Sequence, residues 1–481
     1  MLTHPSTRTV SDGIRGKSLI ALSVVVAFWA LIMVDEMVIS ISLAGIGQAL
    51  QMSQAELSWV VNAYLLPYGG LLLLGGRAGD ILGKRRVFVA GVAFYTAGCL
   101  ARALAPDAWL VIAARGAQGV GAALATPCVL ALIVSMFEEG PLRRRAISAY
   151  TVAGGAGAAV GLMLVGLLGT ISSWRVVLLP SAVFGLVLLV LGPMVIAETP
   201  RRPGRFDLAG ALSATLGIVA IVYGLTTSQG GDWLNGWVIG SVAAGLVLLA
   251  LFVLISRRAR QPLLDLRLFT DRSRVGAYLV LMITPGAQIG LFFYLSQYFQ
   301  IVLGYSTLTT AFAFLAVSVG MTGAASLAVR LEPRIGGRMV ALIGAVLLLI
   351  SNAWLLRMDI GDGYWTGVLP SLVLVGAGVA MAIIPAFSRA TSGVESEDAG
   401  AASSVVSMVQ NVGSSLALAV IVVIATAAST RATEHPPAGL SKEALDGYVF
   451  SQGMQATFLT GAGFAVAALL AALIIGRSRT S

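Results

Sequence analysis

The sequence has very little charge for its length. Asp, Glu, Lys and Arg make up 11% of its 481 residues, whereas soluble domains carry about 25%. Hydrophobic residues make up 57%, and the mean hydropathy is +0.90. So few charged side chains cannot cover a water-facing surface. The composition therefore excludes an ordinary soluble domain and indicates a chain that crosses a membrane many times.

Cysteine and histidine are almost absent. Cys99 and Cys128 lie inside apolar runs, where a thiol packs as a small hydrophobic group, and His4 and His435 lie in polar segments outside those runs. These four residues cannot assemble a metal cluster or a histidine proton relay within the membrane. We therefore expect no metal site and no cofactor.

Motifs for nucleotide binding and catalysis are missing as well. The sequence contains no G-x-x-x-x-G-K-[ST] pattern, so it offers no support for transport driven by ATP. It shows no catalytic constellation, and we expect a protein that is not an enzyme.

Long apolar runs dominate what is present. A helix needs about 20 apolar residues to cross a bilayer. Fourteen runs meet this requirement, and we predict a membrane-spanning helix in each. They are residues 18–43, 58–76, 86–105, 109–136, 146–170, 175–197, 207–227, 236–256, 275–302, 308–329, 339–356, 366–388, 399–427 and 453–476.

Positive charge alternates from loop to loop. If the N-terminus and every second loop share one side, that side holds 25 of the 31 Lys and Arg residues, and Arg115 lies inside the fourth run. The opposite side holds five, namely Arg102, Arg175, Arg357, Arg431 and Lys442. Because cytoplasmic loops carry the excess of Lys and Arg, we predict a multi-pass protein of the cell membrane with both termini in the cytoplasm. The positive charge is then a topology signal, so we expect no nucleic-acid binding.

The runs fall into blocks of six, two and six. We predict a cytoplasmic N-terminus (1–17), a six-helix bundle (18–197), an inserted hairpin (207–256), a second six-helix bundle (275–476) and a cytoplasmic tail (477–481). Transporters built from repeats bind substrate near the midplane between their halves. We expect a monomer in the lipid bilayer, with the polar segment 429–448 packing as a loop over the outer mouth.

Several segments resemble a known family. Residues 75–86 (GGRAGDILGKRR) resemble the cytoplasmic-loop signature G-x-x-x-D-x-x-G-[RK]-[RK] of the major facilitator superfamily. Residues 114–121 (ARGAQGVG) are similar to its R-x-x-Q-G pattern, and residues 59–65 (WVVNAYL) open the second run as in drug:proton antiporters. Residues 34–38, 205–210 and 399–413 resemble the fourteen-helix branch.

This resemblance covers nearly the whole chain. It implies an all-α integral membrane fold of two six-helix bundles plus two inserted helices, and a role in multidrug and antibiotic efflux. One motif departs from the family pattern. The antiporter motif G-x-x-x-G-P-x-x-G-G of the fifth helix keeps its glycines Gly157, Gly161 and Gly166 but lacks the proline, so close packing is retained and the kink is not encoded.

Asp35 and Glu36 lie in the first run. A carboxylate inside a membrane helix costs about 2.5–3.5 kcal/mol on insertion scales, so it indicates a functional site. Asp35 lies about 27 Å from Lys17 along the helix, in the outer half. Adjacent residues point about 100° apart, so we expect one carboxyl to face the central cavity and the other a neighbouring helix.

The two carboxyls are our candidates for proton coupling. Exclusion from water favours a protonated carboxyl, and a cationic substrate favours the ionised one, so proton and cargo would compete for one group. Asp35 is the first candidate, because it matches the family motif, and Glu36 is the second. The alternative is a structural ion pair.

Arg115 is the third residue of this proposed site. An arginine inside a span must be paired or hydrated. We expect it to pair with a carboxyl of the first run, or with Gln118 and backbone carbonyls. It would either tune the proton site or only stabilise the bundle.

The loop signature predicts a conformational latch. Its residues are Gly76, Arg77, Asp80, Gly83, Lys84 and Arg85. A carboxylate at a helix end with arginine partners can hold two halves together on the inner side, and the resemblance implies that this stabilises an outward-open state. The alternative is that these charges only set the topology.

Polar residues inside the spans are candidates for a substrate cavity. They are Asn62, Tyr64, Gln118, Gln288, Tyr294, Gln297, Gln410 and Asn411. Ordinary helix packing is the alternative for each of them.

The sequence therefore predicts a proton-coupled antiporter that exports amphipathic or cationic drugs by alternating access. The alternatives are an exporter of an endogenous natural product or lipid, and a proton-coupled uptake symporter on the same fold. A membrane sensor without flux is a further alternative of a different class.

Overall fold

The computed structural model describes residues 8–137, 141–169, 173–201, 206–227, 235–258, 269–358, 363–392, 399–437 and 441–476. Every regular element in this part of the chain is helical. The helices of the first half are α1 (Arg8–Leu50), α2 (Gln54–Leu82), α3 (Lys84–Ala103), α4 (Ala108–Met136), α5 (Pro141–Gly169) and α6 (Trp174–Val195). The remaining helices are α7 (Leu208–Thr227), α8 (Gly236–Arg258), α9 (Arg272–Gln297), α10 (Thr307–Ile335), α11 (Gly337–Leu355), α12 (Leu369–Thr391), α13 (Ala399–Glu434) and α14 (Lys442–Ile474).

Two π-helical turns extend this set. The turn η2 (Tyr298–Val302) continues α9, and η3 (Tyr364–Val368) leads into α12. The chain forms helices because hydrocarbon offers no partner for backbone N–H and C=O groups, so a lone spanning segment must satisfy them internally. The prediction of an all-α membrane fold is confirmed.

The number of spans is supported for all but one helix. Thirteen helices in the described part are long and apolar enough to cross a membrane. The fourteenth helix is α5, and several of its side chains lie outside the described residues. Fourteen spans therefore stays a prediction.

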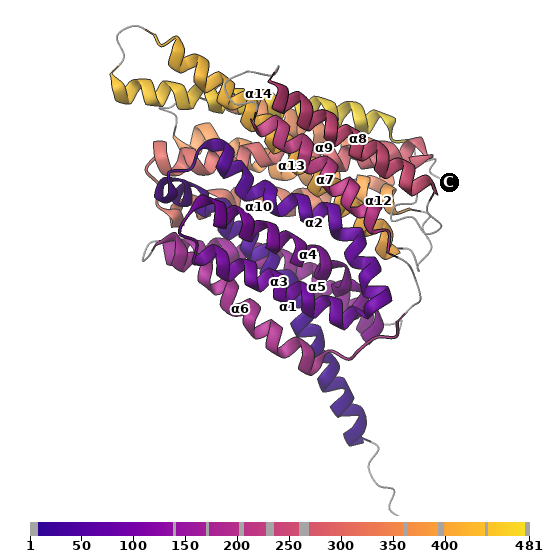
Figure 1. Ribbon diagram of the computed structural model, residues 1–481. Coiled ribbons are helices and arrows are strands. Elements are labelled where there is room, and N and C mark those ends of the chain that lie inside the picture. The colour runs from indigo at the N-terminus through magenta and orange to yellow at the C-terminus, as the bar shows by residue number, and fades with distance from the viewer. Residues whose placement is uncertain are drawn as a thin grey trace, which may run out of the picture.

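Four helices begin with a polar cap at the same face of the molecule. Ser53 and Glu56 form a reciprocal capping box at the start of α2, and Asp107, Ser306 and Ser441 accept backbone N–H bonds at the starts of α4, α10 and α14. We call this the far face. The opposite face, where α1 begins and α14 ends, is the terminal face (Figure 1).

The first and last six helices repeat one packing pattern. In the first set, α4 packs against α2 and α3, while α1 packs against α5 and α6. In the last set, α12 packs against α10 and α11, while α9 packs against α13 and α14. Figure 1 shows the two sets as an indigo-to-magenta layer and an orange-to-yellow layer. The domain boundaries stay a proposal.

The two layers meet along a seam. Helix α2 contacts α13, α5 contacts α10, and α1 contacts α9. The inserted pair α7–α8 packs against α2 and α13, beside the seam. Only Val238, Gly245 and Ser256 of α8 are buried, so most of that helix faces away from the protein.

Helices α13 and α14 continue beyond the bundle at the far face (Figure 1). Helix α13 has 36 residues, which makes it about 54 Å long, compared with about 30 Å for the hydrocarbon layer. The expectation of a loop over 429–448 is therefore wrong in its local structure, because α13 runs to Glu434 and α14 begins at Lys442. Outside the bilayer a helix needs no apolar run, so hydropathy could not mark these turns.

Candidate functional site

A buried cluster of charge lies inside the first bundle. Asp35 and Glu36 come from α1, Arg102 from the last turn of α3, and Arg115 from α4. The side chains of Asp35, Arg102 and Arg115 are 0% exposed. Charges buried this deeply in a membrane protein must be paired.

Both oxygens of Asp35 have partners. Arg102 holds the carboxylate with two hydrogen bonds, from Nη2 to Oδ1 at 2.6 Å and from Nη1 to Oδ2 at 3.0 Å. Arg115 Nη1 lies 3.5 Å from Oδ2, and Gln118 Nε2 donates to the same oxygen at 3.1 Å. A bidentate arginine–carboxylate ion pair is among the strongest contacts that a carboxylate can make.

Gln118 joins the two arginines. Its Oε1 accepts from Arg102 Nη1 at 3.1 Å and from Arg115 Nη1 at 3.4 Å, and its Nε2 also donates to Cys99 Sγ at 3.0 Å. Gln118 is therefore part of the charge network, although the sequence suggested it for the substrate cavity.

Arg115 connects Asp35 to Glu36. Its Nε donates to the backbone oxygen of Val60 at 2.9 Å, and its guanidinium lies 4.2 Å from the ring centroid of Tyr64. Its Nη2 lies 3.5 Å from Glu36 Oε1. The arginine is thus held from the side by α2, and its Nη groups face both carboxylates.

Glu36 is held far less firmly than Asp35. Its side chain is 26% exposed, and its ion pair with Arg115 is long at 3.5 Å. Because adjacent residues of a helix point about 100° apart, the carboxyl of Asp35 lies between α3 and α4, and the carboxyl of Glu36 lies at a partly exposed position. The network therefore holds one fixed and one accessible carboxylate.

The expected position of Arg102 was wrong. The sequence placed it among five basic residues of the outer loops and left Arg115 as the only basic residue deep in a span. Arg102 is instead fully buried and paired with Asp35. The basic residues assigned to the outer loops are therefore reduced to Arg175, Arg357, Arg431 and Lys442. A basic residue near the end of an apolar run looks like a loop residue, because its partner lies on another helix. One signal was available, since Arg102 lies inside the predicted span 86–105 and Asp35 lies at a similar depth.

The predicted latch residues lie at the terminal face between α2 and α3. Gly83 adopts φ +102°, and a Cβ there would lie 2.5 Å from Glu198 Oε1. The backbone N–H of Lys84 donates to Thr199 Oγ1 at 3.0 Å, Arg85 donates to the backbone oxygen of Pro193, and Arg86 Nε lies 3.2 Å from Glu198 Oε2.

These contacts bind the α2–α3 turn to the end of α6 and the segment after it, within the same bundle. Gly76 and Arg77 lie in the last two turns of α2 with the half-buried Asp80. A latch between the two bundles stays a proposal.

The glycines of α5 pack against two different helices. A Cβ added to Gly157 would lie 2.7 Å from the backbone oxygen of Ala30. A Cβ added to Gly161 would lie 2.6 Å from the backbone oxygen of Val34. At Gly166 it would overlap Leu308 of α10. These glycines thus let α5 approach α1 next to Asp35 and α10 across the seam.

The remaining cavity candidates do not gather in one place. Asn62 Oδ1 accepts from Ser415 Oγ at 2.8 Å across the seam, and Asn411 donates to the backbone of its own helix. Gln297 exchanges hydrogen bonds with Gln54 across the seam, at 2.8 Å and 3.4 Å. Tyr64 lies under Arg115, and Gln288 and Gln410 are half-buried.

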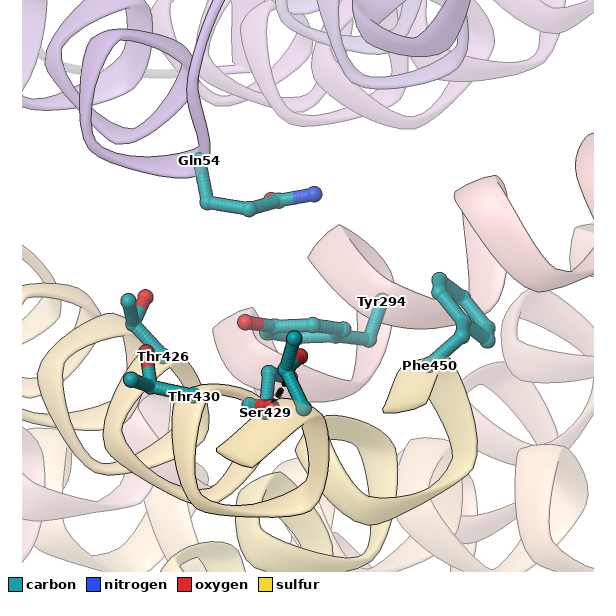
Figure 2. A pocket seen from close by; sticks show the side chains of 7 residues that line it. Gln54, Tyr294, Thr426, Ser429, Thr430 and Phe450 are labelled. Carbon is teal, nitrogen blue, oxygen red and sulfur yellow. Dashed lines mark hydrogen bonds between the residues drawn. The ribbon is translucent and has the colours of Figure 1, made fainter. Parts of the chain in front are cut away.

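Tyr294 lines a separate pocket at the far face (Figure 2). The pocket has a volume of about 180 Å³. Its walls are Gln54, Tyr294, Thr426, Ser429, Thr430, Thr433 and Phe450. Sequence reasoning missed most of these residues, although the polar positions 426, 429, 430 and 433 follow the spacing of one helix face.

Comparison with known proteins identifies the fold and the relatives. The family model described as "Major Facilitator Superfamily" matches residues 24–418. The chain is 36% identical to the puromycin resistance protein pur8 of Streptomyces alboniger over 96% of its own length and 92% of that protein. It is 33% identical to the cephamycin export protein CmcT of Amycolatopsis lactamdurans over 87% of its own length and 86% of that protein.

Solved structures agree on the architecture. A bacterial homolog of the human lysosomal transporter Spinster, in an inward-facing and unoccupied conformation, aligns with a TM-score of 0.65. The alignment covers 95% of this chain and 98% of that one, at 14% sequence identity. This likeness bears on the fold alone.

Proposed function

Because the chain belongs to the major facilitator superfamily, we propose that it exports amphipathic or cationic small molecules in exchange for protons. The family and the relatives show that the chain is a multi-pass membrane transporter and not an enzyme. The relatives named for puromycin resistance and cephamycin export favour outward transport. The direction, the driving ion and the cargo are our proposal.

The orientation is part of this proposal. By sequence, 25 Lys and Arg residues lie in the N-terminal segment, in every second connection and in the C-terminal tail, and the described helix ends that flank these segments lie on the terminal face. With Arg102 buried on α3, four remain in segments on the far face. By the positive-inside rule the terminal face lies in the cytoplasm and the far face outside the cell membrane.

The accessible carboxylate beside Arg115 carries the proposal. Asp35 is fully occupied by Arg102, Arg115 and Gln118, so protonating it would break several buried contacts at once. Glu36 is partly exposed and has one long contact. We therefore assign the exchange of proton and cationic cargo to Glu36, and a fixed structural charge to Asp35.

Charge balance gives this exchange a consequence. With both acids ionised, the two carboxylates neutralise the two arginines. Protonation of Glu36 leaves one positive charge of Arg115 uncompensated in the bundle, which is costly in a low-dielectric site. The uncompensated charge of Arg115 would repel a cationic cargo. Protonation of Glu36 therefore expels the cargo, and deprotonation restores the binding site.

Alternating access requires the seam to open and close. Three hydrogen-bonded contacts link the two bundles in the described part of the chain, namely Gln54 with Gln297, Gln300 with Ile41, and Asn62 with Ser415. All three lie in the half of the molecule nearer the far face. In the proposed cycle they break when the outside opens, and the latch residues between α2 and α3 then hold the terminal face closed.

The test uses purified protein in vesicles with a pH-sensitive dye inside. The probes are puromycin and tetraphenylphosphonium, a cation without hydrogen-bonding groups. We expect substrate to move protons in the antiport direction with the wild type, and Glu36→Gln to abolish this proton movement while the protein still folds. Normal proton movement in Glu36→Gln would refute the assignment, and proton movement of the opposite sign would indicate an uptake symporter.

A second candidate is the export of a natural product that the cell itself makes. The names of the relatives favour it, because one is called an export protein for an antibiotic. Deleting the gene and comparing culture supernatants distinguishes the candidates. Loss of a secreted metabolite supports this function, whereas sensitivity to added cationic drugs alone supports general efflux.

A further inference from the structure

We propose that the far-face pocket binds an uncharged, hydroxyl- or amide-bearing group of the exported molecule, such as a sugar ring, on its way out. The inference rests on the proposed export function and adds a second site to it. The pocket lies at the seam, between the N-terminal end of α2 and the helices α9, α13 and α14 (Figure 2).

The lining determines the chemistry of the ligand. Thr426, Ser429, Thr430 and Thr433 form one hydroxyl-bearing face of α13, and Tyr294 and Phe450 contribute aromatic rings. Hydroxyl groups both donate and accept hydrogen bonds, and rings supply flat apolar contact. None of the seven lining residues is charged, so the pocket has no counter-ion for a cation and favours a neutral polar group.

Two hydroxyls are available for a ligand. Ser429 Oγ donates to the backbone oxygen of Val449 at 3.2 Å and ties α13 to α14, and Thr433 Oγ1 donates to Ser429 O at 3.0 Å. Thr426 and Thr430 have no hydrogen-bond partner among the described residues. In Figure 2 both side chains extend from α13 across the pocket from Gln54, whose amide lies over the ring of Tyr294.

The volume suits a part of a molecule. Pockets for complete drug-sized ligands measure about 300–1,000 Å³. The far-face pocket is smaller, at about 180 Å³. It therefore accommodates one ring or one amide group, while the rest of the cargo remains in the path between the bundles.

Gln54 links occupancy to opening. It is the only lining residue from the first bundle, and its amide is hydrogen-bonded to Gln297 of the second bundle at 2.8 Å. A ligand group that hydrogen-bonds Gln54 competes with this contact. Loss of the Gln54–Gln297 bond removes one of the three hydrogen-bonded links across the seam, so this competition favours separation of the bundles at the far face and release.

The first experiment compares two probes in transport. Thr426→Val and Thr430→Val keep the side-chain shape and remove the hydroxyl. We expect the double variant to raise the apparent KM for puromycin, which carries sugar hydroxyls and an amide, by about tenfold, and to leave that for tetraphenylphosphonium unchanged. Thr460→Val is the matched control, because Thr460 lies on α14 outside the pocket and donates to its own helix. Equal effects on both probes, or no effect on either, would overturn the site.

The second experiment reports occupancy without relying on transport. In Thr430→Cys the new thiol is labelled from outside by an uncharged maleimide, while the native Cys99 and Cys128 are buried. We expect puromycin to slow this labelling and tetraphenylphosphonium to leave it unchanged. If labelling is slowed but no protons move, the site stands and the proposed antiport fails. If puromycin does not slow the labelling, the site is refuted even where antiport is intact.

Discussion

Asp35 and Glu36 are neighbouring residues of the same charge that have different surroundings in one helix. The helical turn directs Asp35 between two guanidinium groups and leaves Glu36 with one distant partner. A buried ion pair stabilises little compared with an apolar pair of the same shape, but the loss of one member leaves an uncompensated charge. The structural role proposed for Asp35 can therefore be separated from the exchange role proposed for Glu36 by paired substitutions.

Arg102 and Asp35 form the first pair to test. We expect Arg102→Gln alone to destabilise the protein by about 3–5 kcal/mol, because Asp35 loses its two-pronged partner. The double variant Asp35→Asn with Arg102→Gln removes both charges and should recover most of the thermal stability, measured by unfolding in detergent. It should also keep proton exchange, because Glu36 and Arg115 remain. A stable double variant without proton exchange would place Asp35 in the exchange.

Gly83 is a residue whose backbone requires glycine. At φ +102°, with Glu198 close to the position of a Cβ, we expect Gly83→Ala to cost about 1–3 kcal/mol. Gly323→Ala on α10 is the control, since no atom lies within 4 Å of its added Cβ. The measurement is again thermal unfolding in detergent, and equal stability of the two variants would contradict the strained turn.

Helix α5 acts as a spacer between α1 and the second bundle. Its glycines bring it against the α1 backbone just before Asp35 and against Leu308 across the seam. The family motif has a proline here that this helix lacks, but the close approach depends on the glycines and persists without it.

Gly161 tests this contact at the level of the element. We expect Gly161→Val to push α5 away from Val34, to cost about 1–3 kcal/mol as overpacking does, and to reduce transport by displacing Glu36. Gly463→Val on α14, where an added Cβ meets nothing within 4 Å, should leave the transport rate close to that of the wild type. The check is the initial rate of puromycin-driven proton movement, and unchanged rates in Gly161→Val would refute the spacer role.

The whole molecule is built from two similar bundles that touch across a seam. Its polar cross-seam contacts in the described residues lie toward the far face. In this structure the bundles are therefore joined at the side proposed to face outward. The proposed export cycle requires that these contacts break in each turnover.

Cross-linking the seam tests alternating access. We expect a cross-link between Gln54→Cys and Gln297→Cys, whose native side chains are hydrogen-bonded, to stop transport until a reductant releases it. A cross-link between Ser351→Cys and Ser371→Cys joins two helices of the same bundle, where the native hydroxyls lie 2.8 Å apart, and should be tolerated. Transport that continues through the cross-linked seam would argue against bundle separation at this point.

Much of the fold could be predicted from hydropathy and charge. Apolar runs of spanning length specify helices because the bilayer excludes other lone segments, and the loop motif at residues 75–86 indicated the family. The candidate site was predicted less completely. Asp35, Glu36, Arg115 and Gln118 were identified as polar residues in apolar runs, but the partner Arg102 was assigned to a loop.

Local composition was enough to predict the helices and to find carboxyls inside the apolar runs, because both features can be seen in a short stretch of sequence. Which carboxyl is held on both oxygens and which is partly exposed could be seen only in the folded protein, since it depends on where α3 and α4 place Arg102 and Arg115. The far-face pocket has the same origin, because its walls come from four helices that are distant in sequence. Contacts between helices follow from their relative rotation, and hydropathy carries little information about rotation.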